Sequence, residues 1–399
     1  MVRSPIYLDN QSTTPLDPRV LDAMLPFLRE RFGNAGSRTH AFGHEAQEAV
    51  EEARASIAAG IGAELREIVF TSGATESNNL ALRGICERSR RRGQHLVSEV
   101  AEHKAILDPL ALLAKRGFEV SLAPVEPAGS EQAGRMDPEK FAALLRDDTL
   151  LASVMLANNE IGVIQPIAEI AALCRARGVV VHTDATQAVG KIAVDVRQLD
   201  CDLLSFSAHK IYGPKGIGAL YVRKRSPAVR LEPLITGGGQ ESGLRSGTLN
   251  VPAIIGFAKA LELCLAERDA EAKRQAELRD MLWSGLQAKI PGLELNGPSL
   301  GRPELRLAGN LNLAFPEVAG EALMLRVPEV AVSSGSACTS ANPEPSHVLK
   351  ALGLSDDTIR CSLRFGLGRF TTTEEIDFAI ERFAAAAIEL RQLVDAPKE

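Results

Sequence analysis

The sequence of 399 residues lacks the features of a membrane protein, a disulfide-bonded protein or a metal-binding protein. No apolar run approaches the roughly 18–20 residues that cross a bilayer, and the first residues, MVRSPIYLDNQSTTP, contain no apolar signal core. The six cysteines form no CxxC pair, which argues against a zinc site or a dithiol centre. Because a reducing compartment keeps such cysteines as thiols, we expect a cytoplasmic protein without a bound metal.

Positive charge is not in excess either. The chain has 45 Lys and Arg against 51 Asp and Glu, a formal net charge of −6. Proteins that bind nucleic acid or anionic membranes usually have a basic surface, so we expect neither as a partner. Hydrophobic residues make up 45% of the chain and charged residues 24%, which is typical of a soluble globular enzyme.

Strand-like apolar runs alternate with amphipathic segments over much of the chain. We expect strands at 67–73, 95–100, 118–125 and 149–160, and helices at 17–31, 45–59, 74–93, 104–117 (interrupted near Pro109) and 166–178. This alternation predicts an α/β fold with a mainly parallel sheet flanked by helices. The chain is strongly helical over 251–290, and a mixed α+β pattern follows. We therefore expect a large domain, 16–262, and a small domain, 1–15 and 263–399.

Two further apolar runs end abruptly in polar residues. VVVHTDATQ reaches Asp184 and Gln187, and LLSFSAHKIYGPKG reaches Ser207 and Lys210. Ligands bind at the carboxyl ends of strands in an open α/β sheet, so the acid and the lysine would share one rim. Pyridoxal phosphate needs a lysine for its aldehyde and an acid for its pyridinium nitrogen. Taken alone, an Asp and a Lys at strand ends are most simply interpreted as ordinary surface residues. The Gly/Pro-rich turn after Lys210 favours the interpretation as a cofactor site.

Two glycine-containing segments are candidates for holding a phosphate. FTSGATESNN (70–79) has the pattern of a strand, a glycine turn and a helix start. Backbone N–H groups at such a start bind anions, although an ordinary capped turn gives the same pattern. No Gly-Lys-Ser/Thr follows, so this is not a Walker loop. The second candidate, GGGQESGLRSGT (237–248), includes Thr248 and is otherwise typical of a plain loop.

A histidine and an arginine complete the candidate site. His103 follows the strand at 95–100, so its imidazole would stack on a pyridine ring and exchange protons there; a helix-capping histidine fits the same position. Arg364, in CSLRFGLGRF, is our choice for a substrate carboxylate, which arginine binds through two parallel hydrogen bonds. The sequence barely separates Arg364 from Arg369. His40 and His44 have metal-like spacing without a third ligand, so we assign them a structural role.

One cysteine differs from the others. Cys338 lies in AVSSGSACTSANPEPSH, whose small and polar residues are typical of an exposed loop. A lone cysteine in such a loop is a candidate nucleophile. We interpret the remaining cysteines as structural: Cys86, Cys174, Cys201, Cys264 and Cys361.

Taken together, these segments resemble the pyridoxal-phosphate-dependent cysteine desulfurases, a group of class V aminotransferases with fold type I. The resemblance covers almost the whole chain, and its most specific segments are FTSGATESNN, EHK, NNEIG, DATQ, SFSAHKIYGPKG, GLRSGT and SSGSACTS. The last segment is similar to that of the housekeeping and nitrogen-fixation desulfurases. Ala101 and Ala208 depart from the family pattern without removing a catalytic group.

The resemblance implies a role for each candidate residue. Lys210 bonds the cofactor and moves protons at the substrate Cα, Asp184 pairs with the ring nitrogen, Gln187 contacts the ring hydroxyl and His103 stacks on the ring. The phosphate is held by the Ala74 backbone, Thr75, Ser207, His209 and, from a second subunit of a homodimer, Thr248. The substrate carboxylate is held by Asn159 and Arg364, together with Asn34.

The resemblance also implies the reaction. L-cysteine is converted to L-alanine, and its sulfur passes to Cys338 as a persulfide. The sulfur then passes to acceptor proteins, such as an iron–sulfur scaffold, for iron–sulfur cluster assembly or thiolation. Two alternatives stay open: a selenocysteine lyase or other class V enzyme, and an inert sulfur carrier or scaffold.

Overall fold

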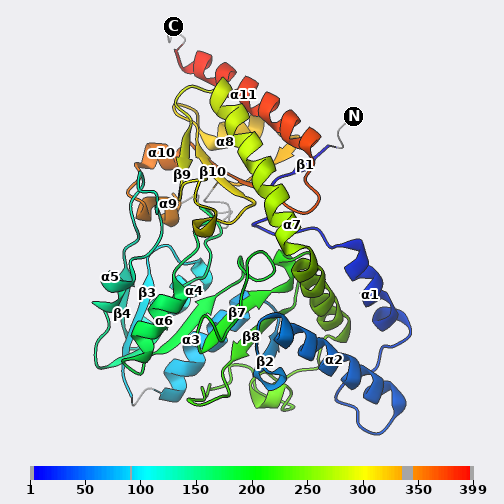
Figure 1. Cartoon of the computed structure of the whole chain (residues 1–399). Coiled ribbons are helices and arrows are strands. Elements are labelled where there is room, and N and C mark those ends of the chain that lie inside the picture. The colour runs from blue at the N-terminus through cyan, green and yellow to red at the C-terminus, as the bar shows by residue number, and fades with distance from the viewer. Residues whose placement is uncertain (1–3, 90–91, 335–344, 396–399) are drawn as a thin grey trace.

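The computed structural model describes residues 4–89, 92–334 and 345–395. A seven-stranded sheet organises the lower part of the molecule, with strand order β2-β8-β7-β6-β5-β3-β4 (Figure 1). Its strands are β2 (Ile68–Thr71), β3 (His95–Glu99), β4 (Glu119–Ala123), β5 (Thr149–Ser153), β6 (Val180–Asp184), β7 (Leu203–Ser207) and β8 (Gly218–Val222). Strands β3 to β7 pair in parallel, and β8 runs antiparallel to both of its neighbours. The predicted mainly parallel α/β sheet is therefore confirmed.

Helices cover both faces of this sheet, which is why its strands are continuous apolar runs rather than alternating ones. Every residue of β5, β7 and β8 is buried. The flanking helices are α1 (Pro18–Arg29), α2 (Ala41–Gly60), α3 (Ala74–Ser89), α4 (Lys104–Lys115), α5 (Pro138–Ala142) and α6 (Ile167–Arg175). On one face, Leu82 of α3 and Leu110 of α4 belong to the same apolar cluster as Leu220 of β8.

A smaller sheet forms the upper part of the molecule (Figure 1). Its antiparallel strands are β9 (Glu294–Asn296), β10 (Asn310–Ala314) and β12 (Ser362–Gly366), in the order β12-β10-β9. The other elements there are β1 (Ile6–Tyr7), which pairs in parallel with β11 (Val330–Ala331), and the helices α8 (Gly320–Arg326), α9 (His347–Ala351), α10 (Asp356–Arg360) and α11 (Thr373–Asp395). Phe365 packs edge-on against Phe383 of α11, with ring centroids 5.0 Å apart.

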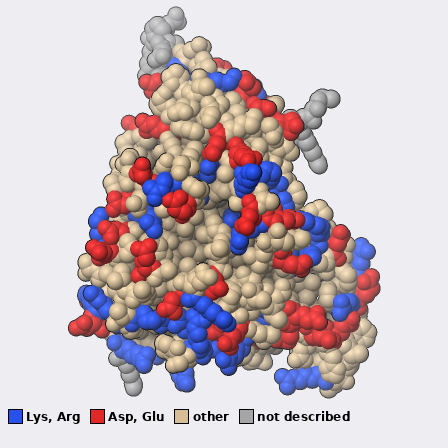
Figure 2. All heavy atoms as spheres, viewed as in Figure 1, with Lys and Arg blue, Asp and Glu red and all other residues tan. Residues whose placement is uncertain are grey.

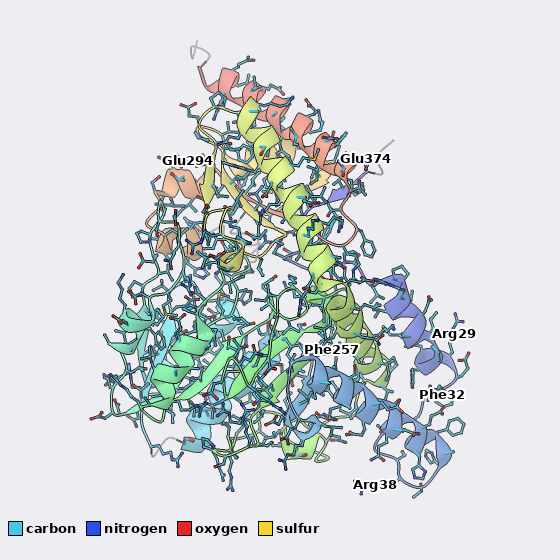
Figure 3. The ribbon with its side chains drawn as sticks, viewed as in Figure 1. Arg29, Phe32, Arg38, Phe257, Glu294 and Glu374 are labelled. Carbon is cyan, nitrogen blue, oxygen red and sulfur yellow. The ribbon has the colours of Figure 1, made fainter. Side chains whose placement is uncertain are left out.

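The long helix α7 (Val251–Lys289) runs diagonally through both parts (Figure 1). Phe257 lies in its first half (Figure 3) and packs against Phe206 of β7, with ring centroids 5.2 Å apart. Leu282 and Leu286, in its second half, belong to the apolar cluster of the smaller sheet. The domain boundary that we predict after residue 262 falls within this helix, and the division into two domains stays a prediction.

One prediction about a helix is wrong, because α4 is not interrupted at Pro109. This proline is the sixth residue of α4, where it removes one backbone hydrogen bond near the start of the helix. Ile106, Leu110 and Leu113 are all buried beside it, so packing holds the helix continuous. The expected start of α1 is confirmed, since Asp17 accepts a hydrogen bond from the Arg19 N–H and Pro18 follows as the first helical residue.

Helix α2 begins before the predicted residue 45, because His40 caps it by accepting a hydrogen bond from the Gly43 N–H at 3.1 Å. Short 3-10 turns connect several elements: η1 (Leu65–Glu67), η2 (Ala208–Lys210), η3 (Glu241–Gly243) and η4 (Pro303–Leu305). Figure 2 shows charges of both signs over the visible face, with Lys and Arg most numerous along its lower edge. Within the described part of the chain, none of the helices has the length and apolarity that a membrane crossing requires.

Candidate active site

The carboxyl ends of β6 and β7 meet at one rim of the large sheet. Asp184, the last residue of β6, pairs in register with Ser205, and β7 ends two residues later at Ser207. The turn η2 follows directly and presents Lys210 at the same rim. A pocket of about 490 Å³ lies there, and most of the predicted site residues line it: Ala74, Thr75, His103, Asn159, Asp184, Gln187, Ser207, His209, Lys210 and Arg364.

Three predicted residues are not among those that line the pocket. Asn34 lies in the exposed loop between α1 and α2, where its side-chain oxygen accepts a hydrogen bond from the Gly36 N–H at 2.8 Å. Thr248 is exposed ahead of α7. Cys338 lies outside the described residues. Within one chain, the structure therefore does not bring Asn34 and Thr248 to the pocket.

Two donors hold the buried carboxylate of Asp184 in a fixed plane. Its Oδ2 accepts from the Asn78 amide at 2.7 Å, and its Oδ1 accepts from the Thr186 backbone N–H at 2.9 Å. Asn78 is a site residue that sequence reasoning missed. The signal was its place within FTSGATESNN, four residues after Ala74, because residues with this spacing share one face of a helix.

Backbone carbonyl groups hold Lys210 in place. Its Nζ donates to the carbonyl oxygens of Gln11 and Ser12, both at 2.6 Å. The glycines that follow Lys210 let neighbouring chain segments approach closely. A Cβ on Gly218 would lie 2.7 Å from the Gly73 Cα, a distance that real side chains do not reach. This contact joins the start of β8 to the turn that opens α3, so both sides of the pocket are held by backbone packing.

His103 is both a helix cap and a pocket residue. Its Nδ1 accepts from the Ala105 N–H at 3.0 Å at the start of α4, which leaves Nε2 as the protonated nitrogen of the neutral ring. Burial lowers the pKa of His103 and favours this neutral form. Burial also raises the pKa of the neighbouring Glu102 carboxyl well above its usual value.

Hydroxyl, imidazole and backbone groups gather where α3 begins. Gly73 precedes the helix with a φ of +153°, a value that favours glycine. Ser207 and His209 line the same pocket as Thr75, and Nδ1 of His209 lies 3.1 Å from the Thr13 hydroxyl oxygen. Burial, with the nearby Lys210 ammonium, lowers the pKa of His209 to about 4, so its ring is neutral. Together with the N–H groups of the helix start, these residues form a candidate anion site.

Sequence reasoning also missed Lys215, which lines the pocket. The signal was the motif IYGPKG, in which Lys215 follows Lys210 across a tight turn. A second ammonium on this side adds positive charge to the anion site.

The structure distinguishes the roles of Arg364 and Arg369, which the sequence barely distinguishes. Arg364 lines the pocket, and its guanidinium donates to the Asn159 carbonyl at 3.0 Å and to Asp9 Oδ1 at 2.7 Å. Arg369 instead ties α7 to the start of α1, through a bond to Asp17 at 2.7 Å and an ion pair with Glu271. Arg364 is therefore the arginine that can meet a substrate carboxylate.

The comparisons with known proteins agree with this geometry. Residues 6–378 match the family described as aminotransferase class-V. The chain belongs to the class-V aminotransferase family. It is 55% identical to a protein named cysteine desulfurase IscS from Anaeromyxobacter dehalogenans, over 98% of this chain and 95% of that protein.

Two solved structures are similar to the whole fold of this class-V family member. A structure titled NifS-like protein has a TM-score of 0.87 and 37% identity, covering 96% of this chain and 98% of that one. A structure titled SspA in complex with cysteine has a TM-score of 0.79 and 33% identity, covering 92% of this chain and 100% of that one.

The family depends on pyridoxal 5′-phosphate, and the residues of this pocket fit that group. The Asn78 Oδ1 and the Thr186 hydroxyl are buried without a partner, and both residues line the pocket. Buried polar atoms without partners are costly, so a polar ligand beside them is favourable. Lys210 would bond the cofactor, Asp184 would face its ring nitrogen, and the α3 start would hold its phosphate. When bound, the cofactor supplies a ring that accepts electrons from the substrate Cα.

Proposed function

We propose that this chain is a cysteine desulfurase, which converts L-cysteine to L-alanine and takes up the sulfur on Cys338 as a persulfide. The thiolate of Cys338 attacks the substrate Sγ, the bond between Cβ and Sγ breaks, and its electron pair stays with the alanine product. The thiol proton of Cys338 leaves with the base that forms the thiolate, and two protons return to the product, one at Cβ and one at Cα. One cysteine and one protein thiol thus give one alanine and one protein persulfide.

The observation that carries this proposal is the position of the described residues on either side of the segment that contains Cys338. On one side, Ser333 accepts a backbone hydrogen bond from Arg364 at 2.7 Å, and its hydroxyl donates to Asp9 Oδ1 at 2.9 Å. On the other side, the Ser346 hydroxyl donates to Glu160 at 2.5 Å, and His347 Nε2 bonds the Glu102 carbonyl at 2.7 Å. One side is therefore attached to Arg364 of the pocket, and the other to Glu102 and Glu160, which adjoin the pocket residues His103 and Asn159 in the sequence.

The length of chain between Ser333 and Cys338 is sufficient for attack. Cys338 is five positions after Ser333 (338 − 333), and an extended chain spans roughly 3.3–3.6 Å per residue, or about 17 Å in all. Because the Ser333 carbonyl accepts from the Arg364 N–H, this spacing in the sequence is compatible with attack of the thiol on a substrate held by Arg364. This supports transfer of sulfur and not of an amino group, because transamination needs no thiol.

The described residues have distinct tasks in this proposal. Arg364, with Asn159, holds the substrate carboxylate, so that the reacting carbon faces Lys210. The Lys210 amine takes and returns the proton at Cα, and the neutral His103 ring stacks on the cofactor. The carboxylate of Asp184, held by Asn78, keeps the ring nitrogen protonated.

Mass spectrometry of the protein after incubation with L-cysteine tests the proposal. We expect one added sulfur atom on the peptide that contains Cys338, and its loss after treatment with a thiol reductant. The buried cysteines are internal controls, since burial raises the pKa of Cys86, Cys174 and Cys201 to about 12. Alanine formation with no sulfur on Cys338, or with sulfur on a different cysteine, would contradict the proposal.

Replacing Arg364 by alanine tests the substrate site. We expect kcat/KM for cysteine to fall by about a hundredfold or more, mostly through KM, because a charge-assisted bond pair to a carboxylate contributes roughly 3 kcal/mol. The visible spectrum of the cofactor should change little. Arg369→Ala is the matched control: we expect it to lower the melting temperature through loss of the Asp17 and Glu271 pairs, and to leave KM unchanged. An unchanged KM in Arg364→Ala would assign the carboxylate to another group.

A homodimer is part of the proposal. Phe32, in the loop after α1 (Figure 3), stacks on Phe42 at the start of α2, with ring centroids 5.5 Å apart, and the two residues are 68% and 52% exposed. Exposed aromatic residues of this kind are typical of protein interfaces. Asn34 lies in the same exposed loop and Thr248 is exposed elsewhere, so both are free to complete the pocket of a second copy.

The acceptors of the sulfur would be proteins that present a thiol, as in iron–sulfur cluster assembly or thiolation. The cytoplasm is the proposed location, because a reducing compartment keeps both the donor and the acceptor thiols available.

A further inference from the structure

A second lysine lies behind the candidate active site and is not used in the proposed reaction. Lys191 closes the segment DATQAVGK, seven residues after Asp184 (191 − 184). Its Nζ donates to the Gln187 Oε1 at 2.8 Å. Lys191 and Lys210 also line one small cavity of about 30 Å³, which Gln11 lines as well. A polar cavity of that size has room for ordered water.

Two hydrogen bonds fix which way the Gln187 amide points, and the bond from Lys191 is the one that holds its oxygen. An ammonium group only donates hydrogen bonds, so the oxygen of the amide must face Lys191. The nitrogen then faces the opposite way, and it donates to the Gln11 carbonyl at 2.9 Å. Gln187 is buried and lines the main pocket, so the second N–H of its amide is available to a ligand there.

The same contacts connect the two lysines. The Gln11 carbonyl that accepts from Gln187 also accepts from the Lys210 Nζ at 2.6 Å. Lys191, Gln187, the Gln11 carbonyl and Lys210 therefore form one continuous hydrogen-bonded chain. Removing the Lys191 ammonium would therefore affect the Gln187 amide directly. It would also affect the surroundings of Lys210, through the Gln11 carbonyl that both Gln187 and Lys210 bond.

We propose that Lys191 is a positioning residue for the cofactor: it fixes Gln187 as a hydrogen-bond donor to the ring hydroxyl oxygen and adds positive charge beside Lys210. The proposal rests on the proposed function, because it assigns a role at the same site. Both effects stabilise negative charge on the ring oxygen and disfavour a proton on the nitrogen that joins Lys210 to the cofactor.

The charged surroundings of Lys191 support this role. Several charged or titratable groups face it or share its cavity: Lys210, Tyr212, Cys264, Arg268, Glu271 and Arg364. Burial, and then the charge of Lys210, lowers the pKa of Lys191 to about 7. The ammonium form, which holds the Gln187 amide, is therefore present below this pH and is lost as the pH rises through it.

The test uses the holoenzyme of Lys191→Met, which removes the charge and the donor but keeps the side-chain length. The measurement is the pH titration of the visible absorbance of the cofactor bonded to Lys210. We expect the apparent pKa of this titration to rise by about one pH unit, because a nearby positive charge and a donor are lost. We also expect kcat to fall by about tenfold with little change in the KM for cysteine.

Two further variants make the test specific. Lys289→Met removes the same charge from an exposed position, where Lys289 pairs with Glu381, and should leave the titration unchanged. Lys191→Arg keeps a donor-only cation and should recover most of the wild-type titration. If Lys191→Met does not retain the cofactor, Lys191→Gln, which keeps a donor without the charge, should show about half of the shift.

The outcomes separate this proposal from the proposed function. A titration that is the same in wild type, Lys191→Met and Lys289→Met would overturn the role of Lys191 and leave the desulfurase proposal intact. An equal shift in Lys191→Met and Lys289→Met would also overturn it, because a general charge effect would then explain the result. A wild-type protein with no visible absorbance from the bound cofactor would count against the proposed function itself.

Discussion

Lys210→Ala is expected to lose the visible absorbance of the cofactor bonded to the protein and to lower the rate of alanine formation by at least about 10⁴-fold. The side-chain amine has two tasks, since it bonds the cofactor and it moves the proton at the substrate Cα. No other described lysine is placed to take over both. Lys191 donates to Gln187 instead, and Lys215 lies on the side of the anion site.

The anion site and Asp184 are unchanged in Lys210→Ala, so the variant should still bind the cofactor without a covalent bond. Native mass spectrometry measures this retention, and the absorbance spectrum measures the loss of the bond. A small primary amine such as methylamine should restore part of the rate, because it supplies the missing base in solution. Undiminished turnover would exclude Lys210 from the chemistry. A wild-type protein with neither absorbance nor turnover would favour an inert sulfur carrier or scaffold.

The large sheet and the rim of the candidate site could be predicted because both depend on local sequence. A buried parallel strand must be apolar along its length, and the change to polar residues marks where it ends. Asp184 and Lys210 stand just after such changes, which is why the sequence alone placed them at one rim. His103 was placed by the same reasoning after β3.

Other features of the site were predicted less firmly or missed, because they depend on contacts between distant segments. Arg364 and Arg369 are five positions apart in the sequence and differ in their partners. Arg364 bonds Asp9 and Asn159, whereas Arg369 bonds Asp17 and Glu271. The spacing of Asn78 from Ala74 shows only a shared helix face, and its role comes from its bond to Asp184, a residue 106 positions away. The interruption predicted at Pro109 was wrong because packing outweighs the loss of one hydrogen bond.

Cys338→Ala has the opposite pattern of expected effects to Lys210→Ala. We expect the visible absorbance of the bound cofactor to be kept, since none of the residues that form the pocket is changed. Formation of both sulfide and alanine from cysteine should fall below detection, because the substrate sulfur has no thiolate to attack it. The absorbance spectrum, an assay for alanine and an assay for sulfide in the presence of a thiol reductant measure the three quantities.

Cys338→Ser is the matched control, because a hydroxyl of similar size cannot accept sulfur as a persulfide and should be equally inactive. Cys361→Ala removes the one cysteine among the described residues that is not buried, and it should keep wild-type turnover. Full turnover in Cys338→Ala would sink the desulfurase proposal and favour another class-V reaction, such as selenocysteine lysis or transamination, which draws on the same pocket without this thiol. We expect Cys338→Ala to lose turnover and keep the absorbance, and Lys210→Ala to lose both turnover and absorbance. That pair of results would assign activation of the substrate to the lysine and removal of its sulfur to the cysteine.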